Sequence, residues 1–299
     1  GDVRGVGVAI FRRDGLEDDA DWVIEKIIPQ ADGFVSTTFG NLLKLVGKTL
    51  IIGEIKRFNN NSFGVYHYER DAGGVGNWGL RSRPFSGELS SLDFDGEHLV
   101  IGNIEEASVG NISDAAVNLQ MGSLVFKHTP GLGNGWDLMK ALAPETAAGP
   151  NGQDAFRFGH SVAVCGDLIV VGAPNFGELV PQLEGHGAFY VFRRNEGGPD
   201  QWGQIASDTG GGSIPFLGSS VAIEGNRIAA SSIYATVASN LSEGKVLLYD
   251  VAEPKAQGEI SPIAILNRPS GFISELFGRN LAFFDGMIAV GSSRPLVPT

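Results

Sequence analysis

A recurring pair of markers constrains this chain more than any other feature of its sequence. A glycine begins a short apolar run that ends in an aromatic residue, and a tryptophan follows fourteen or fifteen residues after that glycine in four copies. The glycines are Gly7, Gly64, Gly122, Gly187 and Gly244, the tryptophans are Trp22, Trp78, Trp136 and Trp202, and Ile260 lies near the tryptophan position of the fifth copy. The glycines are therefore separated by 57, 58, 65 and 57 residues. Repetition at this period indicates an array of stacked supersecondary units.

The first half of the repeat predicts two further strands in each unit. Phe158-Gly159 begins a β-branched run, the Gly166-Asp167 turn follows, and a second run ends at Gly172, which is the pattern of a tight hairpin. Similar starts occur at Phe39-Gly40, Leu217-Gly218 and Phe277-Gly278. A sheet of four short antiparallel strands cannot bury its own faces, so neighbouring units must cover it. The sequence therefore predicts an all-β fold, a β-propeller of four-stranded antiparallel blades.

The predicted blades follow one another along the whole chain. Complete four-strand sets are expected over residues 39–85, 89–143, 158–207 and 217–265, while 3–28 supplies only a third and fourth strand and 277–292 only a first and second. We therefore expect one propeller domain over residues 1–299, with about five blade equivalents. Two arrangements stay open. The two partial sets complete one blade of a closed five-bladed ring, which removes exposed sheet edges, or the chain is part of a larger propeller, for example a seven-bladed one.

The repeat also predicts which residues hold the blades together. The aromatic residue of each Phe-Gly pair is expected to pack between blades, and each tryptophan is expected to anchor the start of a fourth strand. With their accompanying glycines, these structural anchors are Phe39, Gly40, Phe158, Gly159, Gly172, Phe277, Gly278, Trp22, Trp78, Trp136 and Trp202.

One copy of the repeat resembles a known family. Residues 158–163, Phe-Gly-His-Ser-Val-Ala, followed by Val-Gly-Ala-Pro at 171–174, resemble the FG-GAP repeat of integrin α-subunit propellers and of many bacterial and eukaryotic surface proteins. The likeness is close over residues 158–192, and weaker copies cover almost the whole chain. This resemblance implies a β-propeller, usually seven-bladed, that is extracellular and works by binding.

The resemblance also brings calcium into consideration. Integrin-type repeats often carry an Asp-x-Asp-x-Asp-Gly loop in the first hairpin turn, and here only Asp93-Phe94-Asp95-Gly96 has two carboxylates at that spacing. Since Ca²⁺ takes six to eight oxygen ligands, Asp93 and Asp95 alone are a sparse set. They are nevertheless the candidate metal ligands, and calcium is the one cofactor considered. The five histidines show no paired metal-binding spacing.

Composition excludes several classes of partner. The formal net charge is −12, and the 22 lysines and arginines are scattered along the chain. Because phosphate contacts need clusters of basic residues, we expect neither nucleic-acid nor anionic-membrane binding. No run approaches eighteen apolar residues, so no membrane insertion is expected. The single cysteine, Cys165, permits no internal disulfide bond.

One sequence has the form of a catalytic motif. Residues 159–163, Gly-His-Ser-Val-Ala, are similar to a hydrolase nucleophile elbow. The equivalent residues of the next repeat, 218–222, are Gly-Ser-Ser-Val-Ala, so the pattern recurs with the repeat. We therefore expect no catalytic residue and predict that the chain is not an enzyme. A propeller glycosidase-type enzyme is the least favoured alternative, because it would need acidic residues or histidines that converge at the axis.

Three Asn-x-Ser/Thr sequences point to a secreted protein. They begin at Asn60, Asn111 and Asn240, each in a predicted loop between a second and a third strand, and hence on one face of the propeller. Their clustering predicts N-linked glycans and an extracellular or cell-surface location.

The function predicted from these features is a non-enzymatic extracellular or cell-surface module. It would bind a protein or glycan partner, mediate adhesion, or take part in a larger structural assembly. The expected interaction surface is the face that carries the long loops, with 103–121 and 175–186 as its most extended parts, because binding residues concentrate on loops held by a rigid scaffold. The alternative is a propeller lectin with sugars between its blades, which would need exposed aromatic residues in repeated pockets.

Overall fold

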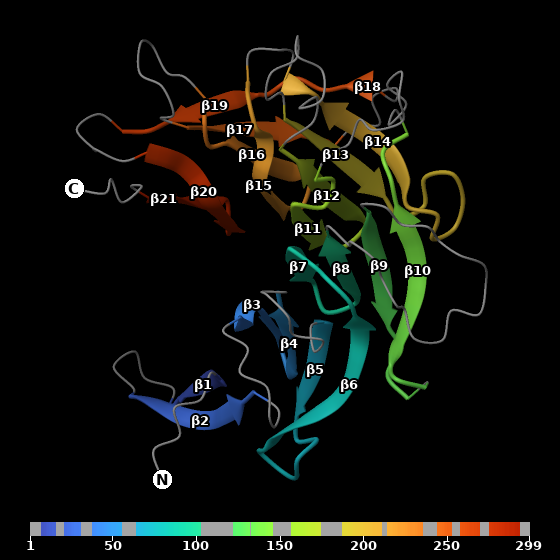
Figure 1. The fold of residues 1–299 in the computed structure, drawn as a ribbon, viewed down its shortest axis with the longest axis vertical. Coiled ribbons are helices and arrows are strands. Elements are labelled where there is room, and N and C mark those ends of the chain that lie inside the picture. The colour runs from blue at the N-terminus through green and yellow to red at the C-terminus, as the bar shows by residue number, and fades with distance from the viewer. Residues whose placement is uncertain are drawn as a thin grey trace. The chain divides into compact units, whose positions relative to one another are not determined.

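The computed structural model consists of β-strands joined by turns, with no α-helix among the residues that it describes (Figure 1). It describes residues 7–15, 21–30, 38–55, 64–102, 122–131, 133–145, 157–174, 187–210, 214–235, 244–252, 258–269 and 275–293. Within these ranges no helix is long and apolar enough to cross a membrane. The chain divides into two compact units, one of residues 1–89, 105–118 and 128–136, the other of residues 90–104, 119–127 and 137–299.

The first unit contains a two-stranded and a four-stranded antiparallel sheet. The two-stranded sheet pairs β1 (Gly7–Arg13) with β2 (Trp22–Pro29). The four-stranded sheet has the order β3-β4-β5-β6, with strands at Phe39–Val46, Thr49–Glu54, Gly64–Arg70 and Trp78–Ser86. Val8, Ile10 and Ile28 lie in one hydrophobic cluster with side chains of the four-stranded sheet, so one face of the β1–β2 sheet is covered.

The second unit contains three larger sheets and a terminal hairpin. The first sheet runs in sequence order through β7 (Ser91–Phe94), β8 (His98–Gly102), β9 (Ser123–His128) and β10 (Trp136–Leu142). The next holds β11 (Ser161–Cys165), β12 (Leu168–Ala173), β13 (Ala188–Arg193), β14 (Gly203–Asp208) and the short β18 (Gly258–Glu259). The third holds β15 (Leu217–Glu224), β16 (Arg227–Ser232), β17 (Lys245–Asp250) and β19 (Ala264–Asn267). The hairpin pairs β20 (Glu275–Phe284) with β21 (Met287–Ser293). His128 and Trp136, at adjacent ends of β9 and β10, group with the first unit.

The predicted four-stranded antiparallel sets are thus present as sheets, with one difference in the last set. Its fourth strand is β19, whereas β18 pairs in parallel with β14 of the preceding sheet. The amide of Ile260 donates to the Ser207 carbonyl, 2.9 Å away, and its side chain packs against the cluster that includes Ala206. The reason is physical: the outer edge of β14 has unpaired backbone groups, and β18 satisfies some of them.

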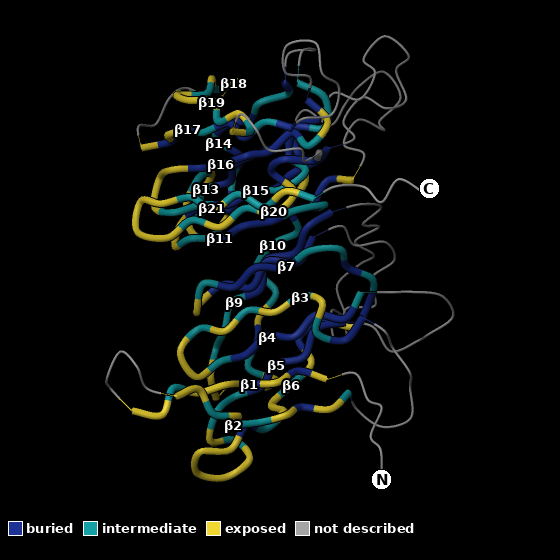
Figure 2. The backbone as a smooth tube through the Cα atoms, turned by 90° about the vertical axis from the view of Figure 1, so that its left-hand side faces the viewer, coloured by how far each residue is buried: buried dark blue, intermediate teal, exposed yellow. Residues whose placement is uncertain are grey.

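The core of the second unit lies between successive sheets. The first strands contact one another in order, β7 with β11, β11 with β15 and β15 with β20. One cluster joins Val100 and Leu142 to Phe158 and Tyr190, and a second joins the β11–β14 sheet to the β15–β17 strands. Figure 2 shows buried residues running through the middle strands and exposed residues at the hairpin turns. This is the packing expected of propeller blades.

The glycines of the repeat are explained by how closely neighbouring sheets approach. A Cβ atom on Gly172 would lie 2.1 Å from the carbonyl oxygen of Gly218, which begins the next sheet. Beside this contact the Ser161 hydroxyl donates to the same carbonyl at 2.8 Å. The arrangement recurs one sheet earlier, where a Cβ atom on Gly102 would meet the Gly159 carbonyl oxygen at 2.1 Å. Glycine recurs at this position of the repeat because the backbones of neighbouring sheets touch there.

The predicted anchors occupy two kinds of environment. Phe39, Phe158 and Phe277 are buried, and their partners Gly40, Gly159 and Gly278 have φ angles of 86°, 89° and 94°, which favour glycine. Trp78, Trp136 and Trp202 are also buried, whereas Trp22 is 67% exposed.

Candidate functional site

Several predicted site residues lie outside the described part of the chain. Asn60, Asn111 and Asn240 are among them, and so are the loops 103–121 and 175–186 that we expected to form the interaction surface. Glycosylation at the three asparagines and binding through these loops remain predictions. The structure does place polar groups at the hairpin turns and within the strands, and these are described below.

Asp93 and Asp95 connect two neighbouring sheets through backbone hydrogen bonds. Asp93 accepts from the amides of Phe94 and Val164, both at 2.9 Å. Asp95 accepts with one oxygen from the amides of Glu97 (2.9 Å) and His98 (2.8 Å), and with the other from Gly166 (3.0 Å). Each of the four carboxylate oxygens therefore has a backbone donor, two of them from the β11–β12 hairpin. A calcium ion at this pair remains a prediction.

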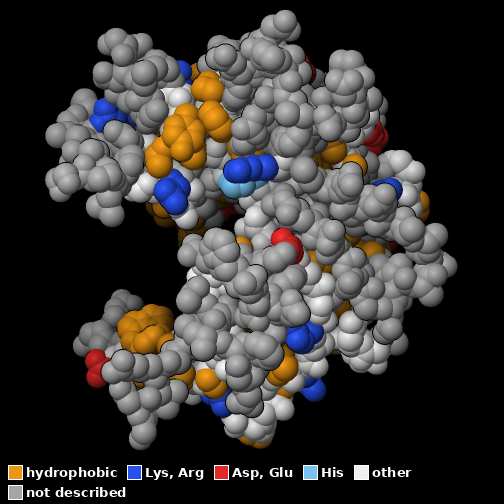
Figure 3. Space-filling model, viewed as in Figure 1, with side chains coloured by type: hydrophobic (Ala, Val, Ile, Leu, Met, Phe, Trp, Pro, Cys, Tyr) orange, Lys and Arg blue, Asp and Glu red, His pale blue; other side chains and the backbone are white. Residues whose placement is uncertain are grey.

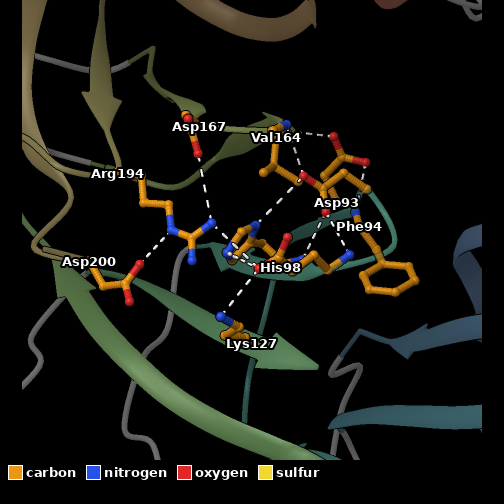
Figure 4. Close-up of polar contacts among 11 residues, drawn as sticks. Asp93, Phe94, His98, Lys127, Val164, Asp167, Arg194 and Asp200 are labelled. Carbon is orange, nitrogen blue, oxygen red and sulfur yellow. Dashed lines mark hydrogen bonds and ion pairs between the residues drawn. The ribbon is translucent and has the colours of Figure 1, made fainter. Parts of the chain in front are cut away.

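A charged network surrounds His98 at the same end of these sheets (Figure 4). Arg194 points from the end of β13 toward Asp200, with which it forms an ion pair, and toward Asp167 at 3.8 Å. Its guanidinium also lies 3.4 Å from Glu97, which Lys127 approaches at 3.3 Å. The network therefore alternates in sign, and each of these charges lies beside one of the opposite sign.

Electrostatics keep the acidic members of this network ionised. Burial acts to raise the pKa of Asp95, but the hydrogen bonds from the backbone amides of Glu97 and His98 and the nearby His98 ring outweigh it, so this pKa lies below its usual value. The pKa of Asp200 is also lowered, chiefly by its hydrogen bond with Arg194. Both carboxylates are consequently negative at neutral pH.

The buried tryptophans each reach back to the preceding sheet. The indole nitrogen of Trp78 donates to Glu25 at 2.8 Å, and that of Trp136 donates to Nδ1 of His67 at 3.1 Å. Trp202 packs edge to face on His98, with ring centroids 5.1 Å apart. Each of these three tryptophans thus contacts the repeat before its own. In two of the three cases its N–H group donates a hydrogen bond to a side chain of that repeat.

Three side chains that can bind a metal ion lie beside the contact between Trp136 and His67. His67, Glu69 and His128 each place one ligand atom so that all three lie within 4.8 Å of one another. Nε2 of His67 is 3.6 Å from Oε1 of Glu69, and Nε2 of His128 is 3.9 Å from that same oxygen. Among the described residues this is the group of three such side chains that could hold a metal ion.

Burial keeps both histidines of this group neutral. It lowers the pKa of His67 to about 4, with a further contribution from the neighbouring His128, and it lowers the pKa of His128 as well. Neutral imidazole is the form that binds metal ions.

Sequence inspection missed this group because the two histidines are far apart in the chain. His67 and Glu69 lie on β5, whereas His128 ends β9, the equivalent third strand of the next repeat. Alignment of the repeats to one another would have placed these strand ends in correspondence, and that is the signal that was available.

Ser161, at the centre of the nucleophile-elbow pattern, has a structural partner. Its hydroxyl donates to the Gly218 carbonyl, and Ser91 makes the equivalent bond to Gly159 at 2.7 Å. The serine therefore contributes to the contact between blades.

Comparison with known proteins supports the resemblance noted in the sequence. Residues 146–192 match the FG-GAP repeat family, so the presence of an FG-GAP repeat is confirmed. The matched segment includes β11, β12 and most of β13. A comparison with curated proteins found no match. An FG-GAP repeat in a chain that also forms several four-stranded antiparallel sheets suggests a propeller-type binding module.

Proposed function

We propose that this chain is a non-enzymatic extracellular or cell-surface module that binds a protein or glycan partner. The observation that carries the proposal is the FG-GAP repeat at residues 146–192, set in a sheet whose faces are covered by its neighbours. Such a scaffold is rigid in its strands and leaves its loops and turns available for contact. Adhesion and the building of a larger extracellular assembly are the two roles that suit a scaffold of this kind.

The use of the polar residues supports a binding role. Ser161 and the two aspartates Asp93 and Asp95 are engaged in bonds between sheets. The remaining charged groups at the turns alternate in sign around Arg194 and Glu97. Alternating charge of this kind gives specificity and orientation to a protein contact.

We further propose that the sheets are blades of one β-propeller. The first strands of successive sheets in the second unit contact one another, as they do around a propeller axis. The pairs β1–β2 and β20–β21 supply complementary halves of a four-stranded blade, third and fourth strands in one and first and second in the other. Small-angle scattering tests this point, because a closed ring gives a compact, disc-like particle and an open array gives an extended one.

Binding is tested with the purified chain on two panels, one of glycans and one of extracellular proteins, by biolayer interferometry. We expect saturable binding to a protein or glycan component, which charge reversal at Arg194, as Arg194→Glu, weakens if the turn end of the sheets takes part. Binding confined to one sugar class on the glycan panel would favour the lectin alternative. Turnover of a glycoside substrate would contradict the proposal.

Glycosylation needs a separate measurement. The chain is expressed with a secretion signal in cultured eukaryotic cells, and its intact mass is compared before and after treatment with a glycosidase that removes N-linked sugars. We expect a loss of mass that disappears when Asn60, Asn111 and Asn240 are all changed to Gln. An unchanged mass in the original chain would show that the sequons are not used.

A further inference from the structure

We propose that His67, Glu69 and His128 form a binding site for a divalent transition-metal ion of the zinc class. The three side chains come from the third strands of two successive repeats, β5 and β9. Two imidazole nitrogens and one carboxylate oxygen are a donor set that zinc uses when one coordination position is left for water or another ligand.

The distances are close to those a bound ion requires. Metal–ligand bonds of about 2.0–2.1 Å in a tetrahedral site place neighbouring ligand atoms about 3.3–3.4 Å apart. The two nitrogen–oxygen distances are 3.6 and 3.9 Å, and all three ligand atoms lie within 4.8 Å. Small side-chain rotations therefore close the site around an ion without movement of the strands.

His67 points an unpaired nitrogen into the site. Its side chain is 2% exposed, and its Nε2 atom has no hydrogen-bond partner in the described structure. A buried polar atom without a partner is costly, and a ligand that binds it removes that cost. This atom is also the one nearest to Glu69 Oε1.

Glu69 is held in the orientation that a metal ligand needs. Arg81 binds Oε2 of Glu69 at 2.7 Å, which leaves Oε1 facing both histidines. A partner on the outer oxygen of a ligating carboxylate fixes its direction, as outer partners do in known metal sites. The positive charge of Arg81 also offsets the charge of Glu69, so the site favours an ion that binds nitrogen over one held by charge alone. That preference selects zinc-class ions and disfavours calcium and magnesium, which take oxygen ligands.

Trp136 opposes metal binding and so provides a specific test. Its N–H donates to Nδ1 of His67, and a neutral ring that accepts there carries its proton on Nε2. A metal ion on Nε2 requires that this proton move to Nδ1, with no net release of a proton. Nδ1 then donates to Ser82 Oγ, 3.3 Å away, while Trp136 loses its acceptor. Removal of the indole N–H should therefore strengthen metal binding.

The experiment titrates the untagged full chain with ZnCl₂ by isothermal titration calorimetry, and with Co²⁺ by visible absorption to report coordination geometry. We expect one zinc equivalent to bind and Co²⁺ to give the intense visible bands of a tetrahedral site. His67→Gln and His128→Gln should each weaken zinc binding by at least about tenfold. Trp136→Phe should strengthen it by about fivefold, the value of one hydrogen bond. His160→Gln, which removes a histidine outside the group, is the matched control and should bind as the original chain does.

Each variant is checked by circular dichroism for a folded β spectrum, and Glu69→Gln, which keeps the shape of the side chain, serves where a histidine variant fails to fold. Absence of zinc binding by the original chain overturns the proposal. Equal loss of binding in His160→Gln and His67→Gln overturns it too. Weaker binding in Trp136→Phe shows that the assigned proton position is wrong and counts against it.

Discussion

The β11–β14 sheet and the two-stranded β1–β2 sheet are built from the same repeat and differ in how much of them is covered. In β13, five successive residues from Ala188 to Phe192 are buried, so both faces of that strand are covered. In β1, the buried Val8 and Ile10 alternate with exposed residues, and Phe11, Trp22 and Ile24 of the β1–β2 sheet are exposed. Figure 3 shows a hydrophobic patch on the surface of this part of the chain. The two regions share the same repeat pattern, so the pattern alone does not determine how far their residues are buried. Burial depends on the sheets that pack against each region.

The tryptophans at equivalent positions of the repeat also differ in burial. Trp202 begins the fourth strand of its repeat and is 1% exposed, whereas Trp22 holds the same place and is 67% exposed. Trp202 has His98 of the preceding sheet to pack on. Trp202 is therefore an anchor in the structure, whereas the place of Trp22 in the repeat does not by itself bury its side chain.

The largest test of this comparison is the loss of a buried aromatic ring. Phe158→Ala should lower the free energy of unfolding by about 3–5 kcal/mol, because Phe158 is fully buried between the β7–β10 and β11–β14 sheets. Phe11→Ala in the β1–β2 sheet removes the same group from a half-exposed place and should cost under about 1 kcal/mol. Urea denaturation measures both, and similar losses in the two variants would break the comparison.

A smaller effect is expected where two sheets touch through backbone. Gly172→Ala places a methyl group against the Gly218 carbonyl, so we expect a loss of about 1–3 kcal/mol. Gly291 holds the equivalent place in the β20–β21 hairpin, where a Cβ atom would approach Asn280 at 3.2 Å. Gly291→Ala should therefore cost less, as measured by thermal unfolding. A greater loss in Gly291→Ala would contradict the role given to the Gly172 contact.

Loss of hydrogen bonds at the hairpin turns should also cost more stability within the larger sheets than at the terminal hairpin. Asp95→Ala removes an acceptor from three backbone amides, one of them Gly166 of the next sheet, and should cost about 1–2 kcal/mol. Glu224 makes one bond of this kind, in which its carboxylate accepts from the Gly286 amide of the terminal hairpin at 2.8 Å. Glu224→Ala should cost under about 1 kcal/mol, and urea midpoints compare the two. A greater loss in Glu224→Ala would contradict the role given to the three hydrogen bonds of Asp95.

The smallest effect concerns pH, because β5 holds a buried histidine, His67, and β1 and β2 contain no histidine. Burial and the nearby His128 lower the pKa of His67 from 6.5 to about 4, although Glu69 acts in the other direction. The unfolded chain therefore binds more protons between these values, so stability is complete above pH 6.5 and falls as the pH drops toward 4. At pH 5.5 the loss is about 1 kcal/mol. His67→Gln should flatten this part of the pH–stability curve, and an unchanged slope would contradict the burial of His67.

Sequence patterns predicted the local structure of this chain better than its long-range contacts. The Phe-Gly pairs and the Gly166-Asp167 turn indicated hairpins correctly, because turn chemistry is local. The parallel β18 was not foreseen, since only the open edge of β14 explains its place. The group of His67, Glu69 and His128 was missed for the same reason, as its members meet only when two repeats stack.

The most direct test of neighbour-dependent stability is hydrogen–deuterium exchange in Phe158→Ala. Phe158 shares a cluster with Val100, Val125 and Leu142 of the β7–β10 sheet, so the account predicts faster exchange in β8, β9 and β10 as well as in β11–β14, and little change in β1–β2. Faster exchange confined to β11–β14 would mean that each sheet is stable without its neighbour. That result would contradict the account.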